Sequence, residues 1–294
     1  MSTIKVGKNE VIKSINEGIK ICNANDEILL TDDYYYEKVI VNKSNITIKS
    51  DIKSIISYDD CYHKIAPDGL EYITVRTHSV IIKADNVKLI NLCIENSAGR
   101  SYIAHQAVAL HLYGDNIKVI DCTIKGSQDT LFTGPLPSDL IKRYKGLLSD
   151  DERLYNKEAR HHFKNCHIIG DVDFIFGGGN DLFENCTIEV LNNFDKPCYI
   201  AAPSHDQDKN YGMVFKNCKI IGEAKKESVY LARPWREYGC VYFIDCELSD
   251  IIHPDGFSIW DNTNRHETCR FYELNSKGKG ANNSSRVNWI NKKR

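Results

Sequence analysis

The sequence has few of the features by which several large protein classes are recognised. It contains two methionines, three tryptophans and seven prolines in 294 residues, and its formal net charge is only −2. A chain so near neutrality has no overall basic field, so we expect neither nucleic acid nor a membrane surface as a partner. No apolar run approaches the roughly 18 residues of a membrane-spanning helix. Hydrophobic residues nevertheless make up 42% of the chain, enough for one sizeable core.

The cysteines lack the spacing of disulfide frameworks or metal sites. There are eleven, an odd number, and no two form a Cys-x-x-Cys pair. We therefore expect free thiols in a reducing compartment. The first eight residues contain no apolar segment of a secretory leader, which favours a cytoplasmic protein over a secreted one whose leader has been removed. The ten histidines are scattered without ligand spacing, so neither a metal nor another cofactor is expected.

The beginning of the chain predicts a helical cap. Residues 9–24 place Val11, Ile15 and Ile19 on one face at three- and four-residue spacing, with charges on the other face. We expect residues 1–31 to cover one end of the structure that follows, because an open sheet edge exposes unpaired strands.

Beyond residue 31 the chain consists of short β-runs that end in Asn, Asp or Gly. From residue 84 a unit recurs in which Asn or Asp precedes Cys, and the cysteines of this unit stand at 93, 122, 166, 186, 218 and 246. Intervals of 20 to 44 residues in all-β sequence are typical of stacked coils whose loops absorb the variation. We predict an all-β fold, a single-stranded right-handed parallel β-helix, as one domain over residues 1–294. The repeated cysteine should point inward, and the Asn or Asp before it should turn the corner.

Two aspartates within residues 126–178 stand beside runs of large apolar residues. Asp129 precedes Leu131 and Phe132, and Asp173 precedes the sequence Phe-Ile-Phe. Carboxylates in apolar surroundings usually have a polar or charged partner or a chemical function, because removing their charge from water is costly. The polar stretch 135–160 is interpreted as an inserted loop. Without it, the two aspartates are about one coil apart.

Two glutamines and an arginine complete the candidate site. Gln106 precedes Asp129 by 23 residues, about one coil, and Gln128 is the residue before Asp129. Stacked coils are ~4.8 Å apart, so both glutamines and both aspartates can converge on one face. Two carboxylates so close do not ionise alike: the one with a cationic neighbour stays charged, and the other is held protonated. Arg233 is the candidate cation, and Trp235 offers a flat surface for a sugar ring.

At these motifs the sequence resembles the pectin methylesterase family over nearly its whole length. Five signatures of the family occur in order, three of them intact; they stand here at Asp33 to Glu37, Gln106 to Leu110, Gln128 to Leu131, Asp173 to Gly177, and Leu231 to Trp235. Asp33 and Ala232 replace glycines of the family pattern. The insert at 135–160 resembles the bacterial branch rather than plant enzymes.

The resemblance implies a carboxylic ester hydrolase that removes methyl groups from C6 methyl esters of galacturonate. Asp173 would attack the ester carbonyl as the nucleophile, and Asp129 would be the acid that protonates the departing methanol. Gln106 and Gln128 would donate hydrogen bonds to the oxyanion. Arg233 would keep Asp173 ionised and take part in substrate binding.

The resemblance also implies how the substrate is held. Trp235, Phe176 and Thr74 would contact the sugar, together with Gln106 and Arg233. The partner would be methyl-esterified homogalacturonan or its oligomers, bound by a monomer without a cofactor.

Four other functions stay open. A pair of carboxylates about 5 Å apart also suits a retaining glycosidase acting on the same polymer, and a lyase has the same fold. An acyl-CoA thioesterase-like member of the family is compatible with a cytoplasmic chain. A non-catalytic carbohydrate-binding β-helix would keep Trp235 and the tyrosines, but it would not need both aspartates and both glutamines.

Overall fold

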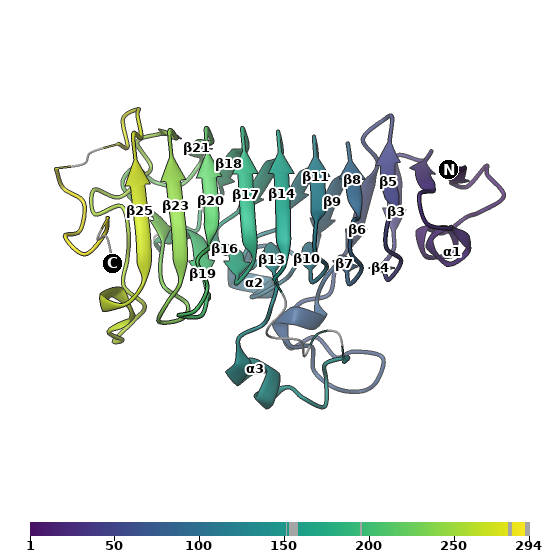
Figure 1. Cartoon of the computed structure of the whole chain (residues 1–294), viewed down its shortest axis with the longest axis horizontal. Helices are drawn as coiled ribbons and strands as arrows, with labels where there is room; N and C mark the ends of the chain where they lie inside the picture. Colours follow the sequence, from purple (N-terminus) through teal and green to yellow (C-terminus); the bar gives the residue numbers. More distant parts are fainter. Residues whose placement is uncertain (151, 153–157, 195, 282–283, 292–294) are drawn as a thin grey trace.

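A computed structural model describes residues 1–150, 152, 158–194, 196–281 and 284–291. The described strands form three parallel sheets that run side by side along one solenoid (Figure 1). Each coil contributes a strand to successive sheets, so the fold is the predicted right-handed parallel β-helix. None of the helices in the described part of the chain has the length and apolar composition that a membrane crossing requires.

The strands are assigned to the three sheets as follows. The ten-stranded sheet contains β1 (Thr3–Val6), β2 (Glu27–Leu30), β5 (Thr47–Ser50), β8 (Lys88–Ile90), β11 (Ile117–Ile120), β14 (Arg160–Lys164), β17 (Asn180–Glu184), β20 (Met213–Lys216), β23 (Cys240–Ile244) and β25 (Arg270–Leu274). The eight-stranded sheet contains β3 (Tyr34–Tyr36), β6 (Ile55–Tyr58), β9 (Cys93–Asn96), β12 (Thr123–Lys125), β15 (His167–Gly170), β18 (Thr187–Val190), β21 (Lys219–Gly222) and β24 (Glu247–Leu248). The seven-stranded sheet contains β4 (Val39–Val41), β7 (Val80–Ile82), β10 (Leu110–Leu112), β13 (Leu131–Thr133), β16 (Val172–Gly177), β19 (Cys198–Pro203) and β22 (Val229–Ala232).

The corner between the ten-stranded and eight-stranded sheets follows the predicted repeat. The Asn or Asp of each unit has a positive φ, with values of 52° to 55° at Asn91, Asp121, Asn165, Asn185, Asn217 and Asp245. These residue types enter the left-handed region more readily than other side chains, so they can turn the chain there. The cysteine that follows is buried in five of the six units.

The first unit departs from the prediction. Cys93 pairs with Thr123 rather than with Cys122, so it lies one position beyond the inward row, and it is only half-buried. Leu92 is fully buried and occupies the inward position. A one-residue shift moves a side chain to the other face of a strand, which explains the error.

The N-terminal helix is shorter than predicted. Helix α1 spans Ile15–Ile21 and packs on β4, β1 and β2, and Ser14 caps its first turn. The carboxylate of Glu37 accepts hydrogen bonds from the backbone N–H groups of Ile15 and Asn16, both at 2.9 Å. Because these caps set the start of the helix, the predicted helix over 9–24 is wrong in its first part, and Val11 is 92% exposed. The role of residues 1–31 as a cap stays a prediction.

Two loops project from the same side of the solenoid (Figure 1). One comprises residues 59–77 and includes the short 3₁₀ helix η1 (Thr74–Arg76); the other is the predicted insert, which carries α3 (Ser138–Arg143). Residues 151 and 153–157 of the insert lie outside the described residues. Its described part is not a purely solvated excursion, because Leu136 and Leu148 are buried against the outer face of the seven-stranded sheet.

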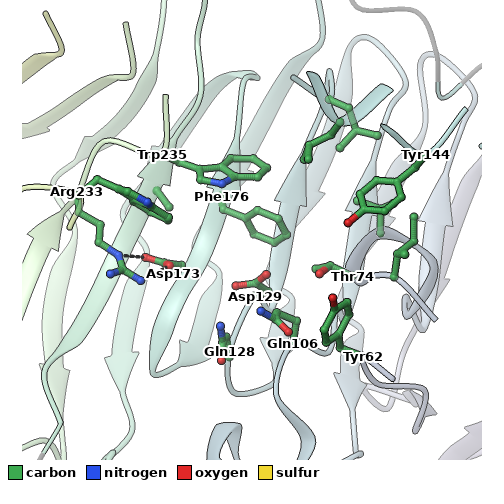
Figure 2. Close-up of a pocket in the computed structure, with 16 residues that line it drawn as sticks. Tyr62, Thr74, Gln106, Gln128, Asp129, Tyr144, Asp173, Phe176, Arg233 and Trp235 are labelled. Carbon is green, nitrogen blue, oxygen red and sulfur yellow. Dashed lines mark hydrogen bonds and ion pairs between the residues drawn. The ribbon is translucent and has the colours of Figure 1, made fainter. Parts of the chain in front are cut away.

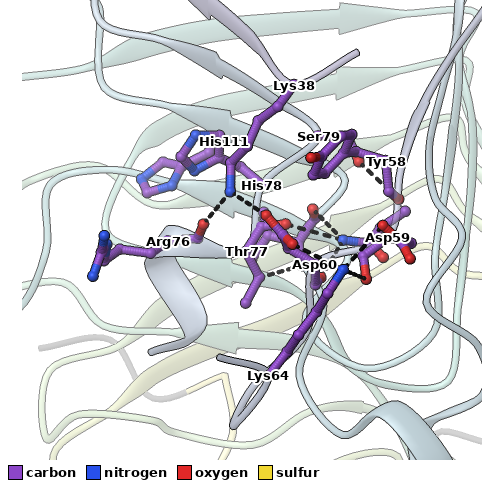
Figure 3. A network of polar contacts seen from close by, with 12 residues as sticks. Lys38, Tyr58, Asp59, Asp60, Lys64, Arg76, Thr77, His78, Ser79 and His111 are labelled. Atoms are coloured by element: carbon purple, nitrogen blue, oxygen red, sulfur yellow. Dashed lines mark hydrogen bonds and ion pairs between the residues drawn. The ribbon is translucent and has the colours of Figure 1, made fainter. Parts of the chain in front are cut away.

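A polar network fastens the 59–77 loop to the solenoid at both of its ends (Figure 3). The Asn96 side-chain amide, from β9, donates to the backbone carbonyls of Asp60 at 2.9 Å and Thr77 at 3.0 Å. The Lys38 ammonium group forms an ion pair of 2.6 Å with the buried Asp60 carboxylate. Buried polar groups linked in this way hold a loop in one conformation.

Candidate active site

The two loops and the seven-stranded sheet enclose a cavity of about 380 Å³ (Figure 2). Its walls include every residue that the sequence predicted for the site: Thr74, Gln106, Gln128, Asp129, Asp173, Phe176, Arg233 and Trp235. These residues come from five separate segments, so the solenoid brings together positions up to about 160 residues apart in sequence.

Asp173 lies on β16 and forms an ion pair with Arg233. The Arg233 guanidinium donates from Nε to one carboxylate oxygen at 2.9 Å and from Nη2 to the other at 2.6 Å. This two-point geometry holds the carboxylate in one orientation. Arg233 is itself held between two rings, because its Cζ atom lies 3.9 Å from the ring centre of Tyr199 and 4.3 Å from that of Trp260.

The local backbone turns Asp173 toward the cavity. Its φ is +48°, and the pairing of β16 with β19 shifts register between Val172 and Ile175, the mark of a β-bulge. Bulges of this kind re-aim a side chain beside a functional site. Phe174 points into the core instead, which requires Gly170, because a Cβ there would lie 2.2 Å from the Phe174 Cβ.

Asp129 occupies the equivalent position on the preceding coil. The pairing of Leu131 with Ile175, continued two residues back, aligns Asp129 with Asp173, and Asp129 also has a positive φ, of 60°. The prediction that the two aspartates are about one coil apart is therefore confirmed. Within the described part of the chain, no cation lies within ion-pair distance of the Asp129 carboxyl group.

The two carboxyl groups differ in their affinity for a proton. Burial, followed by the charge of Asp173, raises the pKa of Asp129 well above its usual value. Burial also raises the pKa of Asp173, but the hydrogen bonds and positive charge of Arg233 oppose that rise. When one proton is shared between the pair, it therefore belongs to Asp129, and Asp173 is the ionised member.

Gln106 and Gln128 lie together beside Asp129. Their backbones pair in parallel, and both side chains lie on the side of Asp129 away from Phe176 and Trp235 (Figure 2). Primary amides at this place can donate hydrogen bonds to an oxygen atom bound between the two aspartates.

The remaining walls are largely apolar and aromatic. Phe176 packs edge-on against Trp235 with ring centres 5.6 Å apart, and both rings line the cavity (Figure 2). Tyr62 and Tyr144 lie near Thr74 at the opposite end of the cavity (Figure 2). An elongated cavity with stacking rings and a few polar groups suits a sugar chain.

Sequence reasoning missed several residues of the site. Tyr62 and Tyr144 belong to the two projecting loops, Trp260 lies between β24 and β25, and Tyr199 faces outward on β19. None of the three tyrosines stands in a motif, whereas the scarcity of tryptophan draws attention to Trp260. Among the described residues, no group of three or more His, Cys, Asp or Glu side chains is arranged to hold a metal ion.

The chain is similar to known proteins in family, in sequence and in structure. A family model described as Pectinesterase matches residues 4–135 and 142–294. Pectinesterase QRT1 of Arabidopsis thaliana is 33% identical over 274 residues, which are 90% of this chain and 64% of that protein. Pectinesterase 5 of the same plant is 28% identical over an alignment of 296 positions, which covers 95% of this chain and 45% of that protein. The chain thus spans less than two thirds of the length of these relatives.

Solved structures are similar along almost the whole chain. A pectin methylesterase from Yersinia enterocolitica has a TM-score of 0.76 and 26% identity, covering 94% of this chain and 93% of its own. A pectin methylesterase from carrot has a TM-score of 0.80 and 24% identity, covering 99% of this chain and 88% of its own, a likeness of fold. The family match spans nearly all of the chain, and this chain therefore belongs to the pectinesterase family.

Proposed function

We propose that this protein is a carboxylic ester hydrolase that removes methyl groups from C6 methyl esters of galacturonate in pectin or its methylated oligomers and releases methanol. One observation carries the proposal: an arginine-paired carboxylate, Asp173, stands on the coil next to a second carboxyl group, Asp129, which has no such partner and whose pKa is raised by burial and by the charge of Asp173. The two groups can supply the nucleophile and the acid of a covalent ester hydrolysis. Two solved pectin methylesterases of this fold were crystallised with hexasaccharides, which supports a sugar chain as the ligand.

The first half of the reaction forms an acyl-enzyme. A carboxylate oxygen of Asp173 attacks the ester carbonyl carbon, and the electron pair of the C=O double bond moves to the carbonyl oxygen. Gln106 and Gln128 donate hydrogen bonds to that oxyanion. The bond from carbon to the methoxy oxygen then breaks, and Asp129 gives its proton to the departing oxygen. Methanol leaves, and an anhydride joins Asp173 to C6 of the sugar.

The second half consumes water and restores the site. Asp129 is now ionised, so it takes a proton from a water molecule as the water oxygen attacks C6 of the anhydride. The bond between C6 and the Asp173 oxygen breaks, leaving a free acid on the sugar. Asp173 returns to its ionised form beside Arg233, and Asp129 is again protonated.

A methanol assay run beside two others tests the proposal. Methylated galacturonate oligomers should release methanol without new reducing ends and without unsaturated uronate products. New reducing ends would point to a glycosidase, and unsaturated products to a lyase. Hydrolysis of an acyl-CoA in place of the oligomer would favour the thioesterase-like alternative. Binding of the oligomers without any reaction would leave only the carbohydrate-binding function.

We infer further that the protein belongs to the bacterial branch of the family and acts in the cytoplasm on short, imported oligogalacturonides. The family model skips residues 136–141, which supports an insertion in this chain. The eleven cysteines, most of them buried, form no disulfide with one another, which suits a reducing compartment. Tyr62 and Tyr144 close around one end of the cavity, which favours a substrate of few sugars.

Substrate length and thiol content test this inference together. Initial rates should be higher on methylated trimers to hexamers than on long pectin at equal ester concentration. Tyr144→Ala should narrow that gap, whereas Tyr34→Ala, at an exposed tyrosine of β3 outside the cavity, should not. Titration of denatured protein should find eleven thiols. Preference for the polymer together with oxidised cysteines would contradict the inference.

A further inference from the structure

Asp171 is a buried carboxylate close to Asp173 in the sequence, and no step of the proposed reaction uses it. It stands two residues before Asp173, at the turn that leads into β16, and its exposed fraction is only 1%. A buried carboxylate needs partners, because the loss of its hydration is costly. Its partners identify its role.

The Asp171 carboxylate accepts three hydrogen bonds. Its Oδ2 atom accepts from the hydroxyl groups of Ser101 and Ser127, both at 2.7 Å. Its Oδ1 atom accepts from the backbone N–H of Val172 at 2.7 Å. Every one of these contacts is with a donor, which is the arrangement that an ionised carboxylate requires.

Each partner belongs to a different catalytic segment. Ser101 begins helix α2 (Ser101–Ala104), which leads into Gln106. Ser127 stands directly before Gln128 and Asp129, and Val172 stands directly before Asp173. The two serine segments are also bonded directly, because the backbone N–H of Ser101 donates to the Ser127 hydroxyl at 2.9 Å. One carboxylate thus ties together the three segments that carry the nucleophile, the acid and both oxyanion donors.

We infer that Asp171 is a positioning residue that sets the relative placement of Gln106, Gln128, Asp129 and Asp173. The inference rests on the proposed function, because it assigns these residues one common reaction. The geometry of such a constellation must hold to a fraction of an ångström, since small misplacements of reacting groups are costly in rate. Contacts that do not involve Asp171 position Trp235 and Arg233. Substrate binding should therefore depend less on Asp171 than the rate of the reaction does.

The charge of Asp171 also acts on both catalytic carboxyl groups. It is among the causes that raise the pKa of Asp129 and the pKa of Asp173. The other titratable or charged groups around it are the Cys198 thiol, whose pKa burial and the Asp171 charge raise to about 12, and Arg100, whose charge acts on the same thiol. Loss of the negative charge at residue 171 should therefore lower the pKa of both catalytic carboxyl groups.

Two substitutions separate positioning from charge. Asp171→Ala removes the three hydrogen bonds, so we expect kcat for methanol release to fall at least about tenfold while KM changes by less than about twofold. Asp171→Asn keeps the shape and can still accept from both serines through its amide oxygen. It should retain more activity than the alanine variant. Both limbs of its pH–rate profile should move to lower pH, because Asp173 then ionises at lower pH and Asp129 loses its proton at lower pH.

Asp26 provides the matched control. It is a buried aspartate that accepts two backbone hydrogen bonds far from the cavity, at 2.7 Å from Ser2 and 2.9 Å from Asn23. Asp26→Ala should not lower kcat beyond its effect on the folded fraction, which circular dichroism and thermal unfolding measure. If Asp171→Ala matched this control, or if Asp171→Asn left both pH limbs in place, the inference would be overturned. Absence of methanol release by the unaltered protein would instead refute the proposed function.

Discussion

Asp129 and Asp173 occupy equivalent positions on neighbouring coils, but their surroundings differ. Both have a positive φ, and both line the same cavity, where Asp173 is buried and Asp129 is half-buried. Asp173 has a two-point ion pair with Arg233, whereas Asp129 has no ion pair among the described residues. The fold therefore supplies two copies of one side chain, and a single arginine 60 residues beyond the second copy makes them chemically distinct.

Asp173→Asn should give the largest loss of activity. The amide is a poor nucleophile, so turnover should fall by roughly a thousandfold or more. Asp129→Asn should also nearly abolish turnover of methyl esters, because methoxide would have to leave without a proton. The fold should survive both changes, which circular dichroism checks.

An activated ester sharpens the distinction between the two variants. The trifluoroethyl ester of a galacturonate oligomer has a leaving group that depends far less on a proton than methoxide does. Asp129→Asn should release about one equivalent of trifluoroethanol per enzyme in a burst and then stall, since the general base for water is missing. Asp173→Asn should show no burst. A burst from Asp173→Asn would mean that the nucleophile lies elsewhere.

Removing the arginine should make the two aspartates more alike. Arg233→Gln leaves the Asp173 carboxylate buried without its counter-charge, so the pKa of Asp173 should rise further and kcat should fall roughly 100-fold. The acid limb of the pH–rate profile should move to higher pH. Arg233→Lys restores the charge but not the two-point geometry, so its acid limb should lie between those of the unaltered protein and the Gln variant. An unmoved acid limb in Arg233→Gln would contradict the account.

The glutamines should affect rate more than binding. Gln128→Ala and Gln106→Ala each remove one donor to the oxyanion, which typically lowers kcat by about 100-fold. KM for the methylated oligomer should change far less, because the oxyanion forms only during the reaction. A rise in KM with unchanged kcat would assign these residues to substrate binding alone.

The smallest expected effect is on stability, and it distinguishes Asp129 by its proton. The pKa of Asp129 is raised in the folded protein, so between the ordinary carboxyl value of about 4 and the raised value folding takes up a proton. Stability should therefore fall as pH rises through that range, and Asp129→Asn should remove this loss. The Tm of the variant should equal that of the unaltered protein near pH 4 and exceed it by about 3 °C or more near neutrality. A constant difference across pH would exclude the proton as its cause.

Much of the fold followed from local sequence patterns. The Asn or Asp at each corner favours the left-handed conformation that the turn needs. The buried cysteines and phenylalanines recur at the same inward positions in successive coils. Phe163, Phe183, Phe215 and Phe243 stack with ring centres 4.5 to 4.6 Å apart, the spacing of neighbouring strands. The helix boundary was missed because the cap from Glu37 comes from another segment, which periodicity does not reveal.

That the proposed catalytic residues lie together could be predicted because they belong to the repeating part of the fold, where separation in sequence converts to separation in space. Tyr62 and Tyr144 could not, because they lie on loops whose course depends on tertiary contacts such as the one between Asn96 and Asp60. Asp171 was missed for a related reason: its two serine partners are 44 and 70 residues away in sequence.

The protonation states of the two aspartates are the most direct test of the account. Protein labelled with carbon-13 at the aspartate carboxyl carbons can be titrated by NMR, and the Asp129→Asn and Asp173→Asn variants assign the two signals. We expect the Asp129 carboxyl group to titrate at a higher pH than Asp173, and Arg233→Gln to narrow the gap. If Asp173 held its proton at a pH where Asp129 had already lost it, the assignment of nucleophile and acid would be contradicted.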